Sequence, residues 1–311
     1  MRKNQANRRL DKQVCLTASL LTMLAIGLYA SETSAYCRTS SCSGGVTGAR
    51  CTPALPTDCG IELFWKNPCV SFSMQQDASS QVSLSVATDI FEKAFQTWTN
   101  ADCGGGKHPR ISVVNLGPVE CHAHEYNKQA GNANVFLFQD TEWTHVGAGS
   151  TLALTTVTYN IDTGEIYDAD MELNSANVSF TMDDKIVKFD LASIVTHETG
   201  HFLGLSHSTT GSATMFSDYT PGSVELRTLD PDDIAGICDI YPPGDAIPAS
   251  CDPSPRRGLA SECSPAPITE EESSCSVAFG KANPSGAATI LSGLAAFGLL
   301  SKRRRGRRHR S

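Results

Sequence analysis

Residues 190–207 read Asp-Leu-Ala-Ser-Ile-Val-Thr-His-Glu-Thr-Gly-His-Phe-Leu-Gly-Leu-Ser-His and carry the strongest structural signal in the chain. Apolar residues recur in this segment at helical spacing, which predicts a helix with one buried face. These apolar residues are Leu191, Ile194, Val195, Phe202 and Leu205. Asp190 is placed to cap the first turn of the helix. Gly204 is placed to end it, because glycine readily adopts the left-handed backbone angles found at helix ends.

Three histidines in this segment are spaced to bind one metal ion. His197 and His201 are four residues apart, so both rings project from the same face of the predicted helix. A turn at Gly204 brings His207 back as a third nitrogen ligand. Three protein ligands leave a fourth position open for water, which is typical of a catalytic zinc site. Glu198 lies between the first two histidines and can take a proton from that water.

The eleven-residue pattern over 197–207, His-Glu-x-x-His-x-x-Gly-x-x-His, resembles the signature of the metzincin metallopeptidases. Within that clan the chain is most similar to the matrixins. The resemblance implies that Met215 forms an apolar floor beneath the metal and that Tyr219 lines the main specificity pocket. Residues 229–237 look like the closing helix of that family. The resemblance therefore implies an α+β domain (a mixed, α/β-like sandwich) over 60–243, with a twisted, mostly parallel sheet and an antiparallel edge strand.

Segments upstream of the histidines fit the same fold. Residues 83–98 place apolar side chains at helical spacing, and residues 134–138 read as a buried strand. Residues 152–159 are β-branched and apolar, and look like the edge strand that binds extended peptide by strand addition. The expected substrate-binding residues are Leu152, Ala153, Leu154 and Tyr219.

Acidic residues alternate along one predicted strand. Asp168, Asp170 and Glu172 fall on the same face of it, because side chains alternate along a strand. Calcium bound at Asp168 and Asp170 is one interpretation, and a solvated acidic face is the other. Matrixins also hold a second, structural zinc with further histidines. The corresponding positions here look like Leu154 and Ile166, so we predict one catalytic zinc and no structural zinc.

Both ends of the chain read as targeting signals. A basic start and an uncharged, mostly apolar run over 14–30 indicate a signal peptide over 1–35, with a retained membrane anchor as the alternative. Residues 285–311 combine a short apolar run with seven Lys and Arg in 301–311. With Cys275 just upstream, this end resembles the C-terminal sorting signals of myxobacterial surface proteins. A plain tail anchor is the alternative there.

Cysteine usage agrees with export. Of the 12 cysteines, Cys15 leaves with the signal peptide and Cys275 belongs to the sorting signal. The other ten are an even number, which in an exported protein suggests up to five disulfides. Residues 36–59 form a Cys-rich N-terminal segment, and residues 244–284 read as a Pro-rich linker. We expect an extracellular or cell-surface protein of a Gram-negative bacterium. It would be monomeric and associated with the outer membrane through its C-terminal segment.

Charge narrows the choice of partners. The net charge is −8 although many basic residues cluster at the two ends, so the body of the chain is acidic. An acidic body argues against nucleic acid as a binding partner. The motifs predict a zinc-dependent metalloendopeptidase that acts on protein or peptide substrates, with Glu198 as general base. The alternative is a non-catalytic surface protein that binds peptide on the same scaffold.

Overall fold

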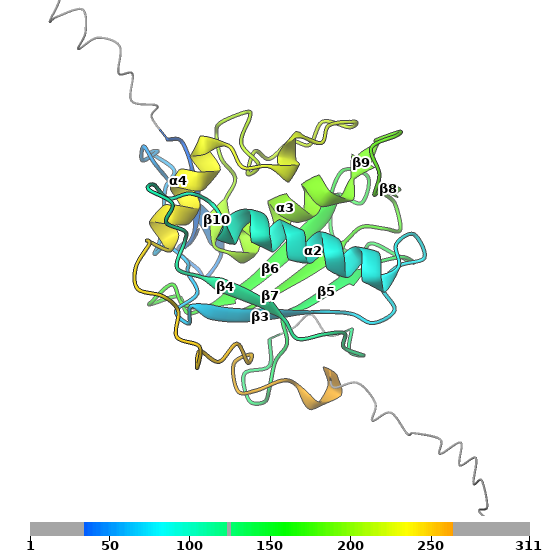
Figure 1. The fold of residues 1–311 in the computed structure, drawn as a ribbon, viewed down its shortest axis with the longest axis horizontal. Coiled ribbons are helices and arrows are strands. Elements are labelled where there is room, and N and C mark those ends of the chain that lie inside the picture. Colours follow the sequence, from blue (N-terminus) through cyan, green and yellow to red (C-terminus); the bar gives the residue numbers. More distant parts are fainter. Residues whose placement is uncertain (1–33, 123–125, 264–311) are drawn as a thin grey trace, which may run out of the picture. The chain divides into compact units, whose positions relative to one another are not determined.

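The computed structural model describes residues 34–122 and 126–263 (Figure 1). The predicted signal peptide, apart from Ser34 and Ala35, and the predicted sorting segment lie outside the described residues. Within the described ranges, no helix has the length and apolar character needed to cross a membrane.

A five-stranded sheet with the order β4-β3-β5-β7-β6 forms the centre of the domain (Figure 1). Strands β3, β4, β5 and β7 pair in parallel, whereas β6 lies at the edge and pairs antiparallel with β7. The bounds are Cys69–Met74 for β3, Ser112–Asn115 for β4, Val135–Phe138 for β5, Ala153–Tyr159 for β6 and Ile166–Leu173 for β7. The expected mixed fold with a mostly parallel sheet is therefore confirmed in outline.

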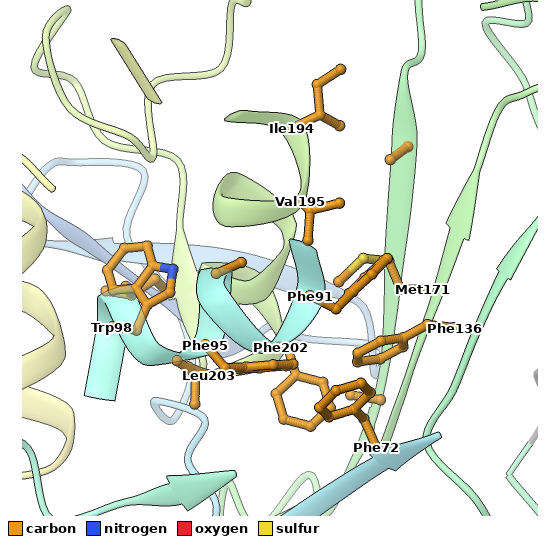
Figure 2. Packing of buried hydrophobic residues seen from close by; sticks show 14 of the residues in the cluster. Phe72, Phe91, Phe95, Trp98, Phe136, Met171, Ile194, Val195, Phe202 and Leu203 are labelled. Carbon is orange, nitrogen blue, oxygen red and sulfur yellow. The ribbon is translucent and has the colours of Figure 1, made fainter. Parts of the chain in front are cut away.

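Two helices pack over one face of this sheet (Figure 1). They are α2 (Leu84–Thr99) and α3 (Leu191–Phe202), and they contact each other. Aromatic rings fill the space between helices and sheet (Figure 2). Phe72 stacks on Phe136 with ring centroids 5.0 Å apart, and Phe202 of α3 meets this cluster edge-on. This packing fixes the position of the helix that carries the first two histidines.

The remaining elements are short. They are the strands β8 (Phe180–Thr181), β9 (Phe189–Asp190) and β10 (Leu205–Ser206), the 3-10 turns η1 (Glu225–Arg227) and η2 (Ser261–Cys263), and the closing helix α4 (Pro231–Ile240). Helix α4 begins with a capping box between Asp230 and Asp233 and has proline at its first position.

The Cys-rich N-terminal segment forms a hairpin that belongs to the domain. Its strands are β1 (Cys37–Ser41) and β2 (Thr47–Cys51), and β1 also pairs antiparallel with β10. Disulfides Cys37–Cys51 and Cys42–Cys59 close the segment. The hairpin therefore extends a small three-stranded sheet that reaches the segment just before His207.

All ten cysteines expected to pair do so within the described residues. The other three disulfides are Cys69–Cys251, Cys103–Cys238 and Cys121–Cys263. Two of them attach residues 244–263, the first half of the expected Pro-rich linker, to the domain. Ala260 and Cys263 pack there with Val135 and Leu137 of β5 in a second, smaller apolar cluster.

The acidic residues of β7 are buried. Asp168, Asp170 and Glu172 are 2 %, 2 % and 1 % exposed, so the interpretation as a solvated acidic face is wrong. Asp170 accepts a hydrogen bond from the backbone N–H of Val135 and pairs with the Asp168 carboxyl, while Glu172 lies 2.8 Å from His145 Nε2. Burial raises the pKa of both aspartates, that of Asp168 to about 6.

This raised pKa predicts a pH-dependent stability that Asp168→Asn removes. The folded state holds the Asp168 proton more tightly than the unfolded chain, so stability falls as pH rises from the unfolded pKa of ~3.9 through about 6. At pH 8 we expect Asp168→Asn to be about 1–3 kcal/mol more stable than wild type. At pH 4 the two proteins should be equal. Urea unfolding in EDTA at both pH values measures this, and an equal loss of stability at both would contradict it.

Candidate metal centre

Three imidazole rings converge where α3 ends. His197 and His201 lie one turn apart on α3, and His207 follows β10 directly. The Nε2 atoms of His201 and His207 are 3.2 Å apart, and one ligand atom from each of the three residues lies within 4.8 Å of the others. Among residues 34–122 and 126–263, no other group of three or more His, Cys, Asp or Glu side chains converges in this way.

Backbone carbonyls orient two of the rings. His197 Nδ1 donates to the carbonyl of Thr214 at 2.6 Å, and His201 Nδ1 donates to the carbonyl of Leu205 at 2.9 Å. These hydrogen bonds place the proton on Nδ1 and leave each Nε2 lone pair for a metal. Burial lowers the pKa of His197 and of His207 to about 4, so both rings are neutral near pH 7.

The donor set fits zinc. Zinc binds imidazole nitrogen at ~2.0–2.1 Å in tetrahedral geometry, which brings neighbouring ligand nitrogens to about 3.3 Å from one another. The 3.2 Å separation of the His201 and His207 nitrogens matches that value. Three neutral nitrogens beside a cavity also leave a fourth position free, as a catalytic zinc requires.

Met215 packs against the helix that carries His197 and His201, and its role as a floor beneath the metal stays a prediction. It is 1 % exposed and lies against Gly200 of α3. A Cβ atom at Gly200 would collide with Met215 Sδ and would come within 2.8 Å of the Trp98 ring. Glycine at this position is therefore required by packing. Gly204 has φ +99°, so the helix ends there as the sequence predicts.

Asp233 anchors the backbone of Met215 from the closing helix. Its carboxylate is 1 % exposed and accepts hydrogen bonds from the backbone N–H groups of Thr214, Met215 and Asp230, at 2.7, 3.0 and 2.9 Å. Burial raises the pKa of Asp233 to about 6 in spite of these bonds. Because the Thr214 carbonyl also orients His197, Asp233 supports a ligand indirectly. Its place in the sequence gives no sign of this role.

The N-terminal hairpin holds the segment between the second and third ligands. Thr39 donates its backbone N–H to the carbonyl of Gly204 and its hydroxyl to the carbonyl of Leu205, both at 2.8 Å. These bonds fix β10, and β10 leads directly into His207. The position of the third ligand therefore depends on a segment far away in the chain.

Glu198 lies between the first two ligands, as expected. It is 7 % exposed, and burial raises the pKa of its carboxyl. The hydroxyl of Thr155, on the edge strand β6, donates to Glu198 Oε2 at 2.7 Å. The sequence gives no indication of this contact, because the two residues lie 43 positions apart.

A cavity of about 480 Å³ adjoins the histidines and Glu198. Of the four expected substrate-binding residues, three line it and Leu154 does not. The three are Leu152, Ala153 and Tyr219. Its apolar wall consists of Val178, Phe189, Ile194, Phe216 and Leu226. The cavity can therefore accept an apolar side chain beside the metal centre.

Tyr219 is hydrogen-bonded to the start of α3. Its hydroxyl donates to the carbonyl of Ser223 at 2.7 Å and accepts the backbone N–H of Asp190 at 2.9 Å. The Asp190 carboxylate caps α3 through the N–H of Ser193 and receives two hydrogen bonds from Arg227, at 2.8 and 2.6 Å. Arg227, which sequence reasoning missed, thus bonds Asp190 at the start of α3, and Asp190 in turn contacts Tyr219 of the cavity wall.

We expect Arg227→Met to destabilise the fold by about 2–4 kcal/mol, since it leaves the fully buried Asp190 carboxylate without its ionic partner. The midpoint of urea unfolding at pH 7 measures the loss. Lys93→Met is the control, because its ion pair with Asp89 is exposed on α2 and its loss should cost below about 1 kcal/mol. Equal midpoints for Arg227→Met and wild type would contradict the role of the ion pair.

Comparison with known families agrees with this geometry. The family model described as Matrixin matches residues 64–242, more than half of the chain. The chain belongs to the matrixin family. Matrixin membership implies zinc, and the triad of His197, His201 and His207 fits a zinc site.

Curated relatives match over short segments. Matrix metalloproteinase-27 of Tupaia belangeri is 42 % identical over 74 residues, which is 21 % of this chain and 14 % of that protein. Metalloendoproteinase 1-MMP of Arabidopsis thaliana is 44 % identical over 57 residues, 18 % of this chain and 15 % of that protein. Human neutrophil collagenase is 35 % identical over 82 residues, which is 24 % of this chain and 18 % of that protein. This matrixin therefore spans less than a fifth of the length of these relatives, and the similarity supports a metalloproteinase in general terms.

Proposed function

We propose that this matrixin is an exported zinc-dependent endopeptidase that hydrolyses peptide bonds in protein or peptide substrates. One observation carries the proposal. Three neutral imidazole nitrogens converge beside a cavity, and the buried carboxyl of Glu198, from the helix that carries His197 and His201, lines the same cavity. A metal that only stapled the fold would need neither the carboxylate nor the cavity.

The roles of the residues follow from their chemistry. His197, His201 and His207 would hold the zinc, which supplies a Lewis acid at its open position when bound. Glu198 takes a proton from the attacking water as general base and returns it to the leaving amine as general acid. The backbone near residues 152–154 is placed to bind the carbonyl oxygen as negative charge develops on it.

The substrate is expected to lie extended along β6. This strand pairs only with β7 among the described strands, so the N–H and C=O groups of its other edge are available to a peptide. One apolar side chain would enter the cavity beside His197 and Tyr219. The preference should therefore favour an apolar residue next to the cleaved bond.

The test is to express the full-length chain with export and disulfide formation, and to measure zinc content and cleavage of unfolded casein. We expect about one zinc per chain. Cleavage should stop with 1,10-phenanthroline and return with added Zn²⁺. A chain that binds zinc and peptide without cutting would support the non-catalytic alternative. Unfolding by the chelator in a protein that never cleaves would point to a purely structural zinc.

Calcium at Asp168 and Asp170 stays a prediction. The two carboxyls are paired and buried, and Ca²⁺ requires ionised oxygen ligands. If Ca²⁺ binds there, it should raise the melting temperature of wild type above pH 7 and leave that of Asp168→Asn unchanged. Export, attachment to the outer membrane through residues 285–311 and the monomeric state remain part of the proposal. Fractionation of the producing cells and sedimentation of the purified protein test them.

A further inference from the structure

The carboxylate of Glu198 has one side-chain partner from the edge strand. Thr155 Oγ1 lies 2.7 Å from Glu198 Oε2 and 3.2 Å from the carbonyl oxygen of the same residue. The shorter contact is to the charged acceptor, and such hydrogen bonds are the stronger ones. Among the described residues, Thr155 is the one donor to this carboxylate, and Oε1 accepts no hydrogen bond.

The strand places this hydroxyl by its register. Thr155 lies opposite Met171 of β7, two residues after Ala153, which lines the cavity. Alternation along β6 therefore directs Ala153 and Thr155 to the same face, the one that meets α3. The strand that would bind the peptide thus also contacts the general base.

A glutamate side chain has three rotatable bonds and two equivalent oxygens, so helix α3 alone does not fix its carboxylate. A hydrogen bond to Oε2 restricts these rotations and leaves Oε1 free for the attacking water. Displacement of a reacting group by ~1 Å can cost about 10²-fold in rate. Small changes in the Glu198 rotamer should therefore appear in kcat.

We propose that Thr155 is a positioning residue that holds the Glu198 carboxylate in its working rotamer through the Oγ1–Oε2 hydrogen bond. This inference rests on the proposed peptidase function. It assigns to the edge strand a role in aligning the base, in addition to peptide binding.

The test compares Thr155→Val, which keeps the shape and removes the hydroxyl, with Thr155→Ser, which keeps the hydroxyl. We expect Thr155→Val to lower kcat about 10- to 100-fold, with KM changed less than about twofold and with zinc content unchanged. Thr155→Ser should keep kcat within about threefold of wild type, because its hydroxyl can make the same bond. Thr97→Val on α2, where the hydroxyl donates to the carbonyl of Lys93 in the same helix, is the control and should match wild type. In a Glu198→Gln background, Thr155→Val should add no further loss, since the two residues act as a unit.

A readout without activity separates this inference from the proposed function. In crystals of the zinc-loaded proteins, wild type should show one Glu198 rotamer and Thr155→Val should show more than one. If wild type cleaves nothing, the peptidase proposal fails, and the rotamers still decide the role of Thr155. Wild-type kcat in Thr155→Val, an equal loss in Thr155→Ser, a loss confined to KM, or an unchanged single rotamer would each overturn the positioning role.

Discussion

Glu198→Ala is expected to lower turnover by about 10³- to 10⁴-fold, while the protein should keep one zinc per chain. In the proposed mechanism the Glu198 carboxylate carries the proton from the attacking water to the leaving amine, and alanine cannot carry it. General acid–base catalysis contributes up to about this factor. The three nitrogens that would hold the metal are untouched, and the rings of His197 and His201 stay oriented by the carbonyls of Thr214 and Leu205. Steady-state cleavage of a fluorogenic peptide, together with metal analysis, measures both quantities.

Glu262→Ala serves as the control for this variant, because Glu262 is exposed and belongs to η2, at the far end of the described chain. It should keep wild-type turnover. Unchanged turnover in Glu198→Ala would refute the assignment of the base. Loss of zinc from Glu198→Ala would instead show that the carboxylate helps to hold the metal.

Asp233→Ala is expected to destabilise the protein by about 3–5 kcal/mol. Alanine leaves the backbone N–H groups of Thr214, Met215 and Asp230 without their acceptor, and each unsatisfied buried donor costs about 1–3 kcal/mol. The loosened Thr214 carbonyl no longer orients His197, so zinc affinity should fall about 10- to 100-fold as well. Urea unfolding and competition with a chromogenic chelator measure the two effects.

The matched control is Asp239→Ala on the same helix. The side chain of Asp239 is 49 % exposed and its ion pair with Arg38 is 3.3 Å long, so its removal should cost less than about 1 kcal/mol. If Asp233→Ala unfolds at the same urea concentration as Asp239→Ala, the proposed anchoring of the methionine floor is wrong.

The sequence predicts the convergence of the three histidines because their geometry is local. His197 and His201 share one helix, and Gly204 ends that helix within one turn of the second ligand. Such spacings are set by helix geometry and by glycine, and need no knowledge of the rest of the fold. The position of Met215 follows for a similar reason, since only eight residues separate it from His207.

The sequence pattern does not predict contacts between segments that are far apart in the chain. Alternation places Asp168, Asp170 and Glu172 on one face, but it does not say whether that face meets water. The answer depends on contacts from distant segments, such as Val135 N–H on Asp170 and His145 on Glu172. The register that brings Thr155 to Glu198 is likewise a property of the assembled sheet. Disulfide pairing shares this limit, because ten cysteines permit many combinations.

The pairing of β1 with β10 links two disulfides to the segment that leads into His207. The β1–β2 hairpin, which holds the segment before His207, lies outside the family match, because that match begins at residue 64. The disulfides Cys37–Cys51 and Cys42–Cys59 close this hairpin. While these four cysteines are reduced, the hairpin is not covalently closed, and the segment before His207 loses part of its support. If the chain is exported and acts as proposed, closure of these two disulfides in an oxidising compartment would complete the support of the segment that leads into His207.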